Sequence, residues 1–108
     1  MKDLSILALS DLYGRALTEK QREILADYYE RDFSLSEIAE NYGISRQGVY
    51  AALSTAEASV KDYEAKFGFY AFLHALNEKL TALKVTGSDV ASGVEDILEW
   101  IRSNYGTV

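Results

Sequence analysis

Apolar residues recur at spacings of three and four along the chain, which is the spacing of one face of an α-helix. The chain contains no proline, and Ala, Leu, Glu and Lys are abundant, which favours helices joined by short turns. The first four predicted helices cover Asp3–Arg15, Thr18–Arg31, Leu35–Tyr42 and a long segment that begins after Ser45. The pattern therefore predicts an all-α fold.

Short polar motifs mark the starts of these helices. Ser34 is followed three residues later by Glu37, and Thr18 is followed in the same way by Gln21. Both pairs have the capping-box pattern, in which the first side chain accepts from a backbone N–H and the second returns the bond. Ser45 stands where the fourth helix needs an N-cap.

The stretch Ser34–Leu53 has the pattern of a helix-turn-helix, the unit that lays its second helix in the major groove of DNA. Ala39 is small where the two helices cross, and Gly43 suits a left-handed turn. The expected apolar contacts between the two helices come from Ile38, Tyr42, Ile44, Val49 and Leu53. The alternative is a plain helical hairpin with a glycine turn.

An apolar stripe continues along the fourth helix in alternating steps of four and three. Its members are Val49, Leu53, Ala56, Val60, Tyr63, Phe67 and Tyr70. Such a heptad seam outruns a small helix-turn-helix body, so we expect it to be buried against a second copy. The predicted dimer interface consists of Val60, Tyr63, Phe67 and Tyr70. The aromatic group Phe67, Phe69, Tyr70 and Phe72 fits core packing and a subunit contact equally well.

The rhythm of apolar positions changes near Gly68, which predicts a kink or a new helix there. A turn is expected over Val85–Ser88, with Ser88 as N-cap of a last helix that reaches Tyr105. Gly93 weakens that helix, so the helix depends on packing, and Trp100 is its expected packing anchor. We expect residues 1–66 to form the helix-turn-helix domain and residues 67–108 a helical dimerisation or closing extension of it.

Charge and composition limit the classes of partner. The net charge is −6, with 17 acidic and 11 basic residues, so the whole molecule repels a phosphate backbone. There are no cysteines, which excludes disulfides and thiolate metal sites. No apolar run approaches the length that spans a bilayer, and the start of the chain fits a signal peptide poorly, so we expect a cytoplasmic protein without membrane insertion.

The candidate DNA contacts lie at the start of the second helix of the motif. They are Ser45, Arg46, Gln47 and Tyr50, and Arg46 suits guanine whereas Gln47 suits adenine. In the structural interpretation, Ser45 is only a cap, Arg46 is a solvated charge and Tyr50 is a packing residue. Both interpretations stay open. Lys20 and Arg22, near the start of the second helix of the chain, are candidate phosphate contacts, or else solvent-facing charges.

The motif carries little positive charge. Between Ser34 and Ala56 the only basic residue is Arg46, against Glu37 and Glu40, which gives a local charge of −1. A symmetric dimer would double the few available contacts, so weak binding to double-stranded DNA depends on pairing of two copies.

No pattern in the sequence indicates catalysis or a cofactor. The single histidine, His74, lies in an apolar stretch without a nearby nucleophile or carboxylate pair, which favours a packed or half-exposed helix residue. Phosphate-binding glycine loops and metal-ligand spacings are missing from the sequence. We therefore expect a protein that is not an enzyme and needs no cofactor.

The stretch Leu17–Leu53 resembles the last DNA-binding region, region 4, of a sigma-70-type factor, and residues 4 to about 67 resemble the YlxM family of helix-turn-helix proteins. The carrying residues include Ser-Arg-Gln followed by Val-Tyr, and later Tyr63-Glu64. The resemblance implies an all-helical, dimer-forming cytoplasmic protein, encoded beside the genes of the signal recognition particle GTPase, with a regulatory part in that protein-targeting pathway. The alternative is a DNA-binding transcriptional regulator whose recognition helix starts at Arg46.

Overall fold

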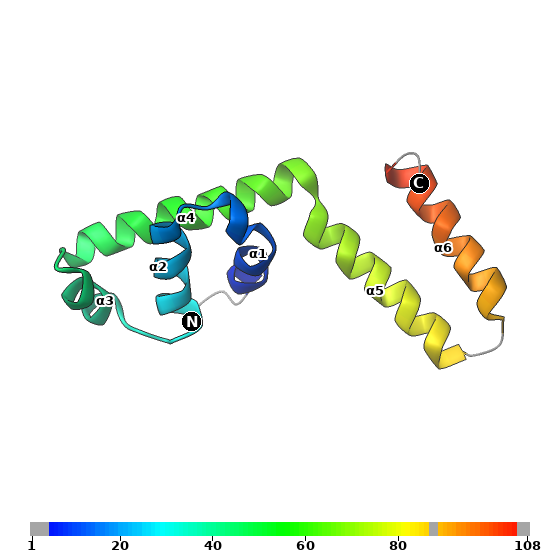
Figure 1. Cartoon of the computed structure of the whole chain (residues 1–108), viewed down its shortest axis with the longest axis horizontal. Coiled ribbons are helices and arrows are strands. Elements are labelled where there is room, and N and C mark those ends of the chain that lie inside the picture. Colours follow the sequence, from blue (N-terminus) through cyan, green and yellow to red (C-terminus); the bar gives the residue numbers. More distant parts are fainter. Residues whose placement is uncertain (1–4, 87–88, 106–108) are drawn as a thin grey trace. The chain divides into compact units, whose positions relative to one another are not determined.

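The computed structural model describes residues 5–86 and 89–105, and every regular element in these ranges is a helix (Figure 1). The elements are α1 (Ser5–Tyr13), the 3-10 turn η1 (Gly14–Ala16), α2 (Glu19–Tyr29), α3 (Leu35–Tyr42), α4 (Arg46–Phe67), α5 (Phe69–Thr86) and α6 (Val90–Tyr105). The predicted all-α fold with a helix-turn-helix in α3 and α4 is confirmed. Asp3 and Leu4 of the predicted first helix lie outside the described residues.

The helix starts predicted from the capping motifs are present. The Thr18 hydroxyl accepts from the Gln21 N–H, and the Gln21 side chain accepts from the Thr18 N–H, both at 3.1 Å. Ser34 and Glu37 form the second capping box in the same way. The Ser45 hydroxyl accepts from the Gly48 N–H at 3.0 Å and caps α4. Local chemistry alone thus fixed where three helices begin.

The chain divides into two compact units, Met1–Tyr70 and Ala71–Val108. The division lies four residues after the boundary that we expected at residues 66 and 67. The second unit contains α6 and all but the first two residues of α5, and so covers most of the segment expected to form a dimerisation or closing extension.

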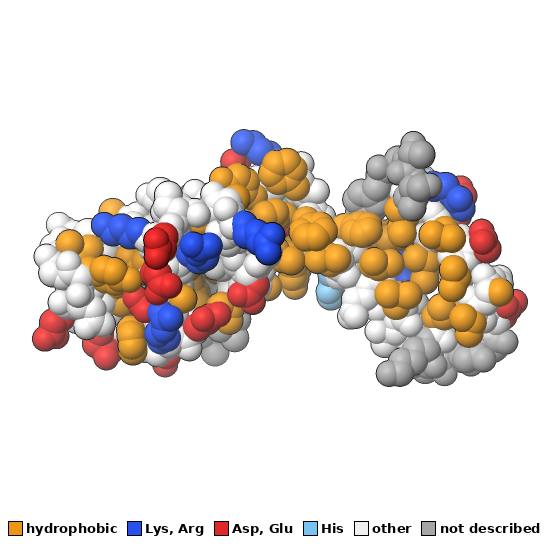
Figure 2. Space-filling view, in the orientation of Figure 1, with side chains coloured by type: hydrophobic (Ala, Val, Ile, Leu, Met, Phe, Trp, Pro, Cys, Tyr) orange, Lys and Arg blue, Asp and Glu red, His pale blue; other side chains and the backbone are white. Residues whose placement is uncertain are grey.

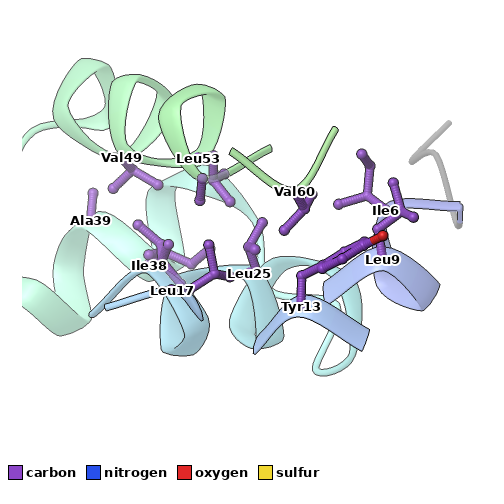
Figure 3. Packing of buried hydrophobic residues seen from close by; sticks show 12 residues of the cluster. Ile6, Leu9, Tyr13, Leu17, Leu25, Ile38, Ala39, Val49, Leu53 and Val60 are labelled. Carbon is purple, nitrogen blue, oxygen red and sulfur yellow. The ribbon is translucent and has the colours of Figure 1, made fainter. Parts of the chain in front are cut away.

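In the first unit, α1, α2 and α3 all pack against α4 (Figure 1). Figure 3 shows Val49, Leu53 and Val60 of α4 directed at side chains of the other three helices. The buried cluster consists of Ile6, Leu9, Tyr13, Leu17, Ile24, Leu25, Ile38, Ala39, Val49, Leu53, Ala56 and Val60. One long helix therefore supplies the backbone on which the helix-turn-helix is built.

This core corrects the expected role of the heptad stripe. Val60, predicted at a dimer interface, is 0% exposed and packs inside its own chain. Val49, Leu53 and Ala56 are buried there too. The prediction for Val60 is wrong because α1 and α2, which lie earlier in the sequence, cover this side of α4, and periodicity does not tell which helix covers a stripe.

A hydrogen-bond cluster holds the junction of α4 and α5. Gly68 ends α4 with φ +61°, as the change of rhythm predicted. The Tyr13 hydroxyl donates to Glu64 Oε1 at 2.6 Å and accepts from the Phe69 N–H at 3.1 Å. Glu64 Oε1 also accepts from the Tyr70 N–H at 2.9 Å. The first turn of α5 thus has two N–H donors satisfied by side chains of earlier helices.

The same cluster predicts an alkaline loss of stability. Burial raises the pKa of Tyr13 above 10.0, and its hydrogen bond to Glu64 raises it further. Because the folded protein keeps this proton where the unfolded chain loses it, the stabilisation is complete below about pH 10 and falls as the pH rises towards the folded pKa. Urea unfolding at stepped alkaline pH should show this fall in the wild type. The fall should be shallower in Tyr13→Phe, and equal slopes would contradict the assignment.

The second unit is a helical hairpin in which the start of α5 contacts the end of α6. The Phe72 and Trp100 rings stack with centroids 5.8 Å apart, and Lys79 Nζ lies 4.8 Å from the Trp100 ring centroid. Further along, Gly93 of α6 lies so close to Leu83 that a Cβ atom on Gly93 would fall 2.3 Å from Leu83 Cδ1. Close packing therefore explains the glycine that weakens α6, and Trp100 is a packing anchor as predicted.

The link between α5 and α6 differs from the prediction. The helix α5 runs to Thr86 and so includes the start of the expected turn over Val85–Ser88. Ser88, predicted as the N-cap of α6, lies outside the described residues. Asp89 acts as a cap, since its Oδ1 accepts from the Ser92 N–H at 3.1 Å. Serine and aspartate are both good N-cap residues, so the sequence pattern did not show which of Ser88 and Asp89 would cap α6.

Candidate nucleic-acid interface

The start of α4 carries polar side chains that point away from the core. Arg46, Gln47 and Tyr50 are all exposed, and Tyr50 is exposed to 65%. Ser45 caps the helix through its hydroxyl, which is the role that the structural interpretation gave it. Val49 and Leu53 hold the opposite side of the same turns in the core. A rigidly held helix therefore presents its first turns to solvent.

The turn before α4 sets the angle between the two helices of the motif. Gly43 has φ +66°, a left-handed conformation that a Cβ atom would strain. The N–H of Ile44 donates to the carbonyl of Ala39 at 3.0 Å. Ala39, Ile38, Val49 and Leu53 pack as predicted, whereas Tyr42 and Ile44 are each 37% exposed. Both side chains lie at the rim of the motif, where Ile44 lies beside Gly48 of α4 and the Tyr42 hydroxyl reaches Asp27 of α2.

A buried carboxylate fastens the motif to α2, and sequence reasoning missed it. Asp27 is 7% exposed and accepts from the Tyr42 hydroxyl at 2.9 Å and from the Arg31 guanidinium. Arg31 also forms an ion pair with Glu23 at 3.5 Å. Burial, then the bond to Asp27, raises the pKa of Tyr42. The available signal was an aspartate beside the apolar stripe of α2 with an arginine four residues later.

The two predicted phosphate contacts on α2 lie in different places. Lys20 is exposed and lines a shallow groove with Ala51 and Thr55 of α4. Arg22 lines another groove, with Asp11, Gly14, Glu30 and residues of α1. Its Cδ atom lies 3.5 Å from where a Cβ atom of Gly14 would stand. The structure thus brings Lys20, but not Arg22, to the side of the candidate interface.

The exposed face of α4 has two edges with small residues between them. Arg46 and Tyr50, four residues apart, share one edge, since a helix turns about 100° per residue. Thr55, beside Lys20, marks the other edge, and the exposed residues Ala51 and Ser54 lie between. A nucleic-acid backbone could approach α4 closely over such small side chains. Arg46 would then lie on one side of it and Lys20 on the other.

The charge around this face is mixed. The Glu37 carboxylate is held by the capping box of α3, and Glu40 is exposed. Figure 2 shows acidic and basic side chains interspersed over the visible face of the first unit. The Arg31 guanidinium pairs with two carboxylates, and Lys66 pairs with Asp62 at 3.0 Å. Arg46 and Lys20 are therefore the cations that the geometry places beside the exposed turns of α4.

The aromatic group near the end of α4 is divided between packing and exposure. The rings of Tyr13 and Tyr63 lie 5.8 Å apart, and Tyr63 is half-buried. Phe67 stacks on Tyr63 yet is 67% exposed, and Tyr70 is 39% exposed. Phe72 packs on Trp100, as described above. Of the four residues of the predicted dimer interface, Phe67 and Tyr70 are therefore the exposed ones.

The described residues can also be compared with the requirements of a histidine site, a metal site and a membrane span. His74 is exposed, and its Nε2 lies 3.1 Å from Glu78 Oε1 one turn further along α5. Within residues 5–86 and 89–105, no cluster of three His, Cys, Asp or Glu side chains has the arrangement of a metal site. No helix in the described ranges combines the length and apolar character needed to cross a bilayer.

Comparison with known proteins gives consistent matches over most of the chain. The model of the UPF0122 family, described as YlxM / p13-like helix-turn-helix proteins, matches residues 1–98. A UPF0122 protein of Caldanaerobacter subterraneus is 47% identical over 81 residues, which are 75% of this chain and 69% of that protein. A UPF0122 protein of Fusobacterium nucleatum is 37% identical over 97 residues, 88% of this chain and 94% of that protein.

The matches also extend into the second unit. A UPF0122 protein of Limosilactobacillus reuteri is 42% identical over 104 residues, which are 96% of this chain and 80% of that protein. The resemblance that the sequence motifs showed up to about residue 67 therefore continues through α5 and most of α6.

Proposed function

The chain belongs to the UPF0122 family of YlxM / p13-like helix-turn-helix proteins, and from this premise we propose that it is a regulatory protein that binds double-stranded DNA through α4. The observation that supports this most is the start of α4, where Arg46, Gln47 and Tyr50 are exposed while the opposite side of the helix is locked in the core. That arrangement is what a recognition helix needs to enter a major groove.

Each side chain of the interface has a role in this proposal. The Arg46 guanidinium can donate two bonds to the O6 and N7 atoms of guanine, and the Gln47 amide can pair with adenine. Tyr50 lies on the same edge as Arg46 and contacts the sugar or a thymine methyl. Lys20, at the other edge of the face, neutralises a phosphate. Ser45 acts through the cap, and Arg22 has no part.

The net charge of the chain limits the expected affinity for DNA. A net charge of −6 opposes approach to DNA, and one motif offers few cations. Two copies on a two-fold symmetric site would double the contacts, so the proposal includes a homodimer. It also places the protein in the cytoplasm with the chromosome. Binding is expected to be weak and strongly dependent on salt.

Selection from a pool of random duplexes, followed by anisotropy with the enriched duplex, tests the proposal. Affinity should fall steeply between about 50 and 200 mM salt, because counterions are released on binding. Arg46→Ala should weaken binding by roughly tenfold or more and relax sequence preference, as expected for a lost guanine contact of about 1–3 kcal/mol.

Arg22→Ala is the matched control, since it removes the same charge from the groove between α1 and α2. The control should change affinity by much less than Arg46→Ala. If no duplex is enriched, or if both variants weaken binding equally, α4 is not the recognition element.

A second candidate function is regulatory contact with components of the signal recognition particle, as the family resemblance implies. The mixed, acidic surface favours it, because an acidic protein binds a basic protein partner more readily than it binds nucleic acid. Purified particle GTPase, with and without its RNA, should then co-elute with this protein or change its GTP turnover. Separate elution and unchanged turnover would exclude this candidate.

A further inference from the structure

The α5–α6 hairpin buries little of its own apolar surface. Among its described residues, Ile97 is the one apolar side chain that counts as buried. On the side facing α6, α5 presents Phe72, Lys79 and Leu83. On the side facing α5, α6 presents Gly93, Ile97 and Trp100. These contacts hold the two helices together but use only one side of each.

Each helix has a second apolar stripe beside this contact. In α5 the stripe consists of Leu73, Leu76 and Leu80, and in α6 it consists of Val90, Val94, Leu98 and Ile101. Leu80 is 48% exposed, Val90 57% and Val94 41%, and the other members are half-buried. Exposed apolar side chains in rows of this kind mark an interaction surface rather than scattered surface residues.

The two stripes lie on the same face of the hairpin. Leu73 and Leu80 each follow a contact residue of α5, and Val94 and Ile101 each follow a contact residue of α6, so both stripes are rotated about 100° from the contact in the same sense. The helices are antiparallel, because the start of α5 meets the end of α6. An equal right-handed rotation on two antiparallel helices leads to the same side. Hydrophobic side chains gather over α5 and α6 in Figure 2.

We propose that this face, formed by Leu73, Leu76, Leu80, Val90, Val94, Leu98 and Ile101, is covered by the same face of a second copy. Two such hairpins would form a four-helix bundle with the apolar stripes inside, which is the usual way for a pair of helices to complete a core. The assignment rests on the pairing of two copies included in the proposed function, and it moves the interface away from the sequence-predicted Val60.

The chemistry of the face favours a second copy over a charged partner. The seven side chains are all aliphatic, and two described ion pairs of the hairpin lie off the stripes. His74 pairs with Glu78, and Arg102 pairs with Glu99, off the stripes. A surface made mainly of aliphatic side chains is complementary to another of the same kind.

The size of the face also suits a dimer. Helices of 16 and 18 residues are about 25 Å long, and two helices side by side are about 20 Å wide. The flat projection of the face is therefore about 500 Å², and side-chain relief adds to the accessible area. Each partner of a standard stable interface buries about 800 Å². The hairpin face thus supplies most of what a stable homodimer requires.

Sedimentation equilibrium of the full chain, without DNA, tests this proposal. The wild type should have twice the 12.1 kDa mass of one chain at micromolar concentration. Leu80→Glu and Val94→Glu should each raise the dimer Kd roughly 100-fold or more, because a charge would be buried in the apolar centre. Both positions are exposed in the single chain, so circular dichroism should show unchanged helix content.

Thr81→Glu is the matched control. Thr81 is exposed on α5, next to Leu80 but about 100° away from the stripe, so this variant should remain dimeric. Since the residues from 71 to 108 include five acidic and three basic side chains, added salt should leave the dimer intact or strengthen it, unlike a complex with DNA.

Two results would overturn the assignment. A monomeric wild type would refute pairing itself, together with the dimeric form of the proposed function. A dimer that resists Leu80→Glu and Val94→Glu but dissociates in Phe67→Glu would keep the pairing and place it at the exposed aromatics near the end of α4 instead.

Discussion

Val60→Glu is expected to destabilise the first unit strongly rather than to separate two subunits. Val60 is completely buried among side chains of α1 and α2, and a glutamate there would lose its hydration without gaining a partner. Burial of an unpaired charge belongs to the few changes that cost about 4 kcal/mol or more. Because a domain of this size is stable by about 5–15 kcal/mol, the variant should lose a large share of its stability, and its unfolding midpoints should fall far below those of the wild type.

Thermal and urea unfolding followed by circular dichroism measure this effect. Phe67→Glu is the control, because it places the same charge seven residues further along α4, where the side chain is 67% exposed. That variant should keep the wild-type midpoint within a few degrees. A folded, monomeric Val60→Glu protein would show instead that this part of α4 is covered by a second copy.

Asp27→Ala is expected to cause the second-largest loss, about 2 kcal/mol. The substitution removes the acceptor of the Tyr42 hydroxyl and one of the two carboxylates that hold Arg31. A buried polar group without its partner typically costs 1–3 kcal/mol, roughly the range expected here. Arg31 remains paired with Glu23 and accessible to water, which keeps the loss below that of Val60→Glu.

A double-mutant cycle separates this bond from general damage to α2. Asp27→Ala and Tyr42→Phe should each destabilise the protein, and the combined variant should lose less than their sum, because both changes remove one shared bond. Glu23→Ala, on the same face of α2 but exposed, should cost much less. Strict additivity of the two changes would mean that the Tyr42–Asp27 bond contributes nothing.

Substitution of Asp27 should also affect DNA binding at the candidate interface. Tyr42 is the last residue of α3, next to the Gly43 turn that aims α4. If DNA binding follows the proposal, Asp27→Ala should weaken it even under conditions in which the protein remains folded. Asp27 is therefore a positioning residue for the interface. Measurements of stability and of binding on the same variant separate this role from a general loss of stability.

The helix boundaries and turns were predictable because their causes are local. Thr18, Ser34 and Ser45 each bond to an N–H three residues ahead, and Gly43 and Gly68 occupy left-handed positions. Such interactions lie within one turn of helix, so the sequence displays every partner at once. The sequence also marked Arg46, Gln47 and Tyr50 as candidate contacts, but it left open whether Tyr50 packs, and the structure shows all three exposed.

The partners of each apolar face were not predictable in the same way. The stripe on α4 looked like a seam for a second chain, but α1 and α2 cover it. Lys20 and Arg22, two residues apart, face different grooves, and Asp27 finds Tyr42 fifteen residues away. Contacts between distant segments depend on the packing of whole helices, which periodicity does not encode.

The amino-acid sequence by itself determined the all-helical fold, the helix-turn-helix and the polar residues at the start of α4, since spacing and capping act over a few residues. Only the tertiary structure decided that Val60 is core, that Asp27 fastens α3, and that the hairpin of α5 and α6 leaves a face uncovered. The physical reason is that burial depends on contacts between helices. Which surface packs against a given apolar face is decided by the arrangement of whole helices in space.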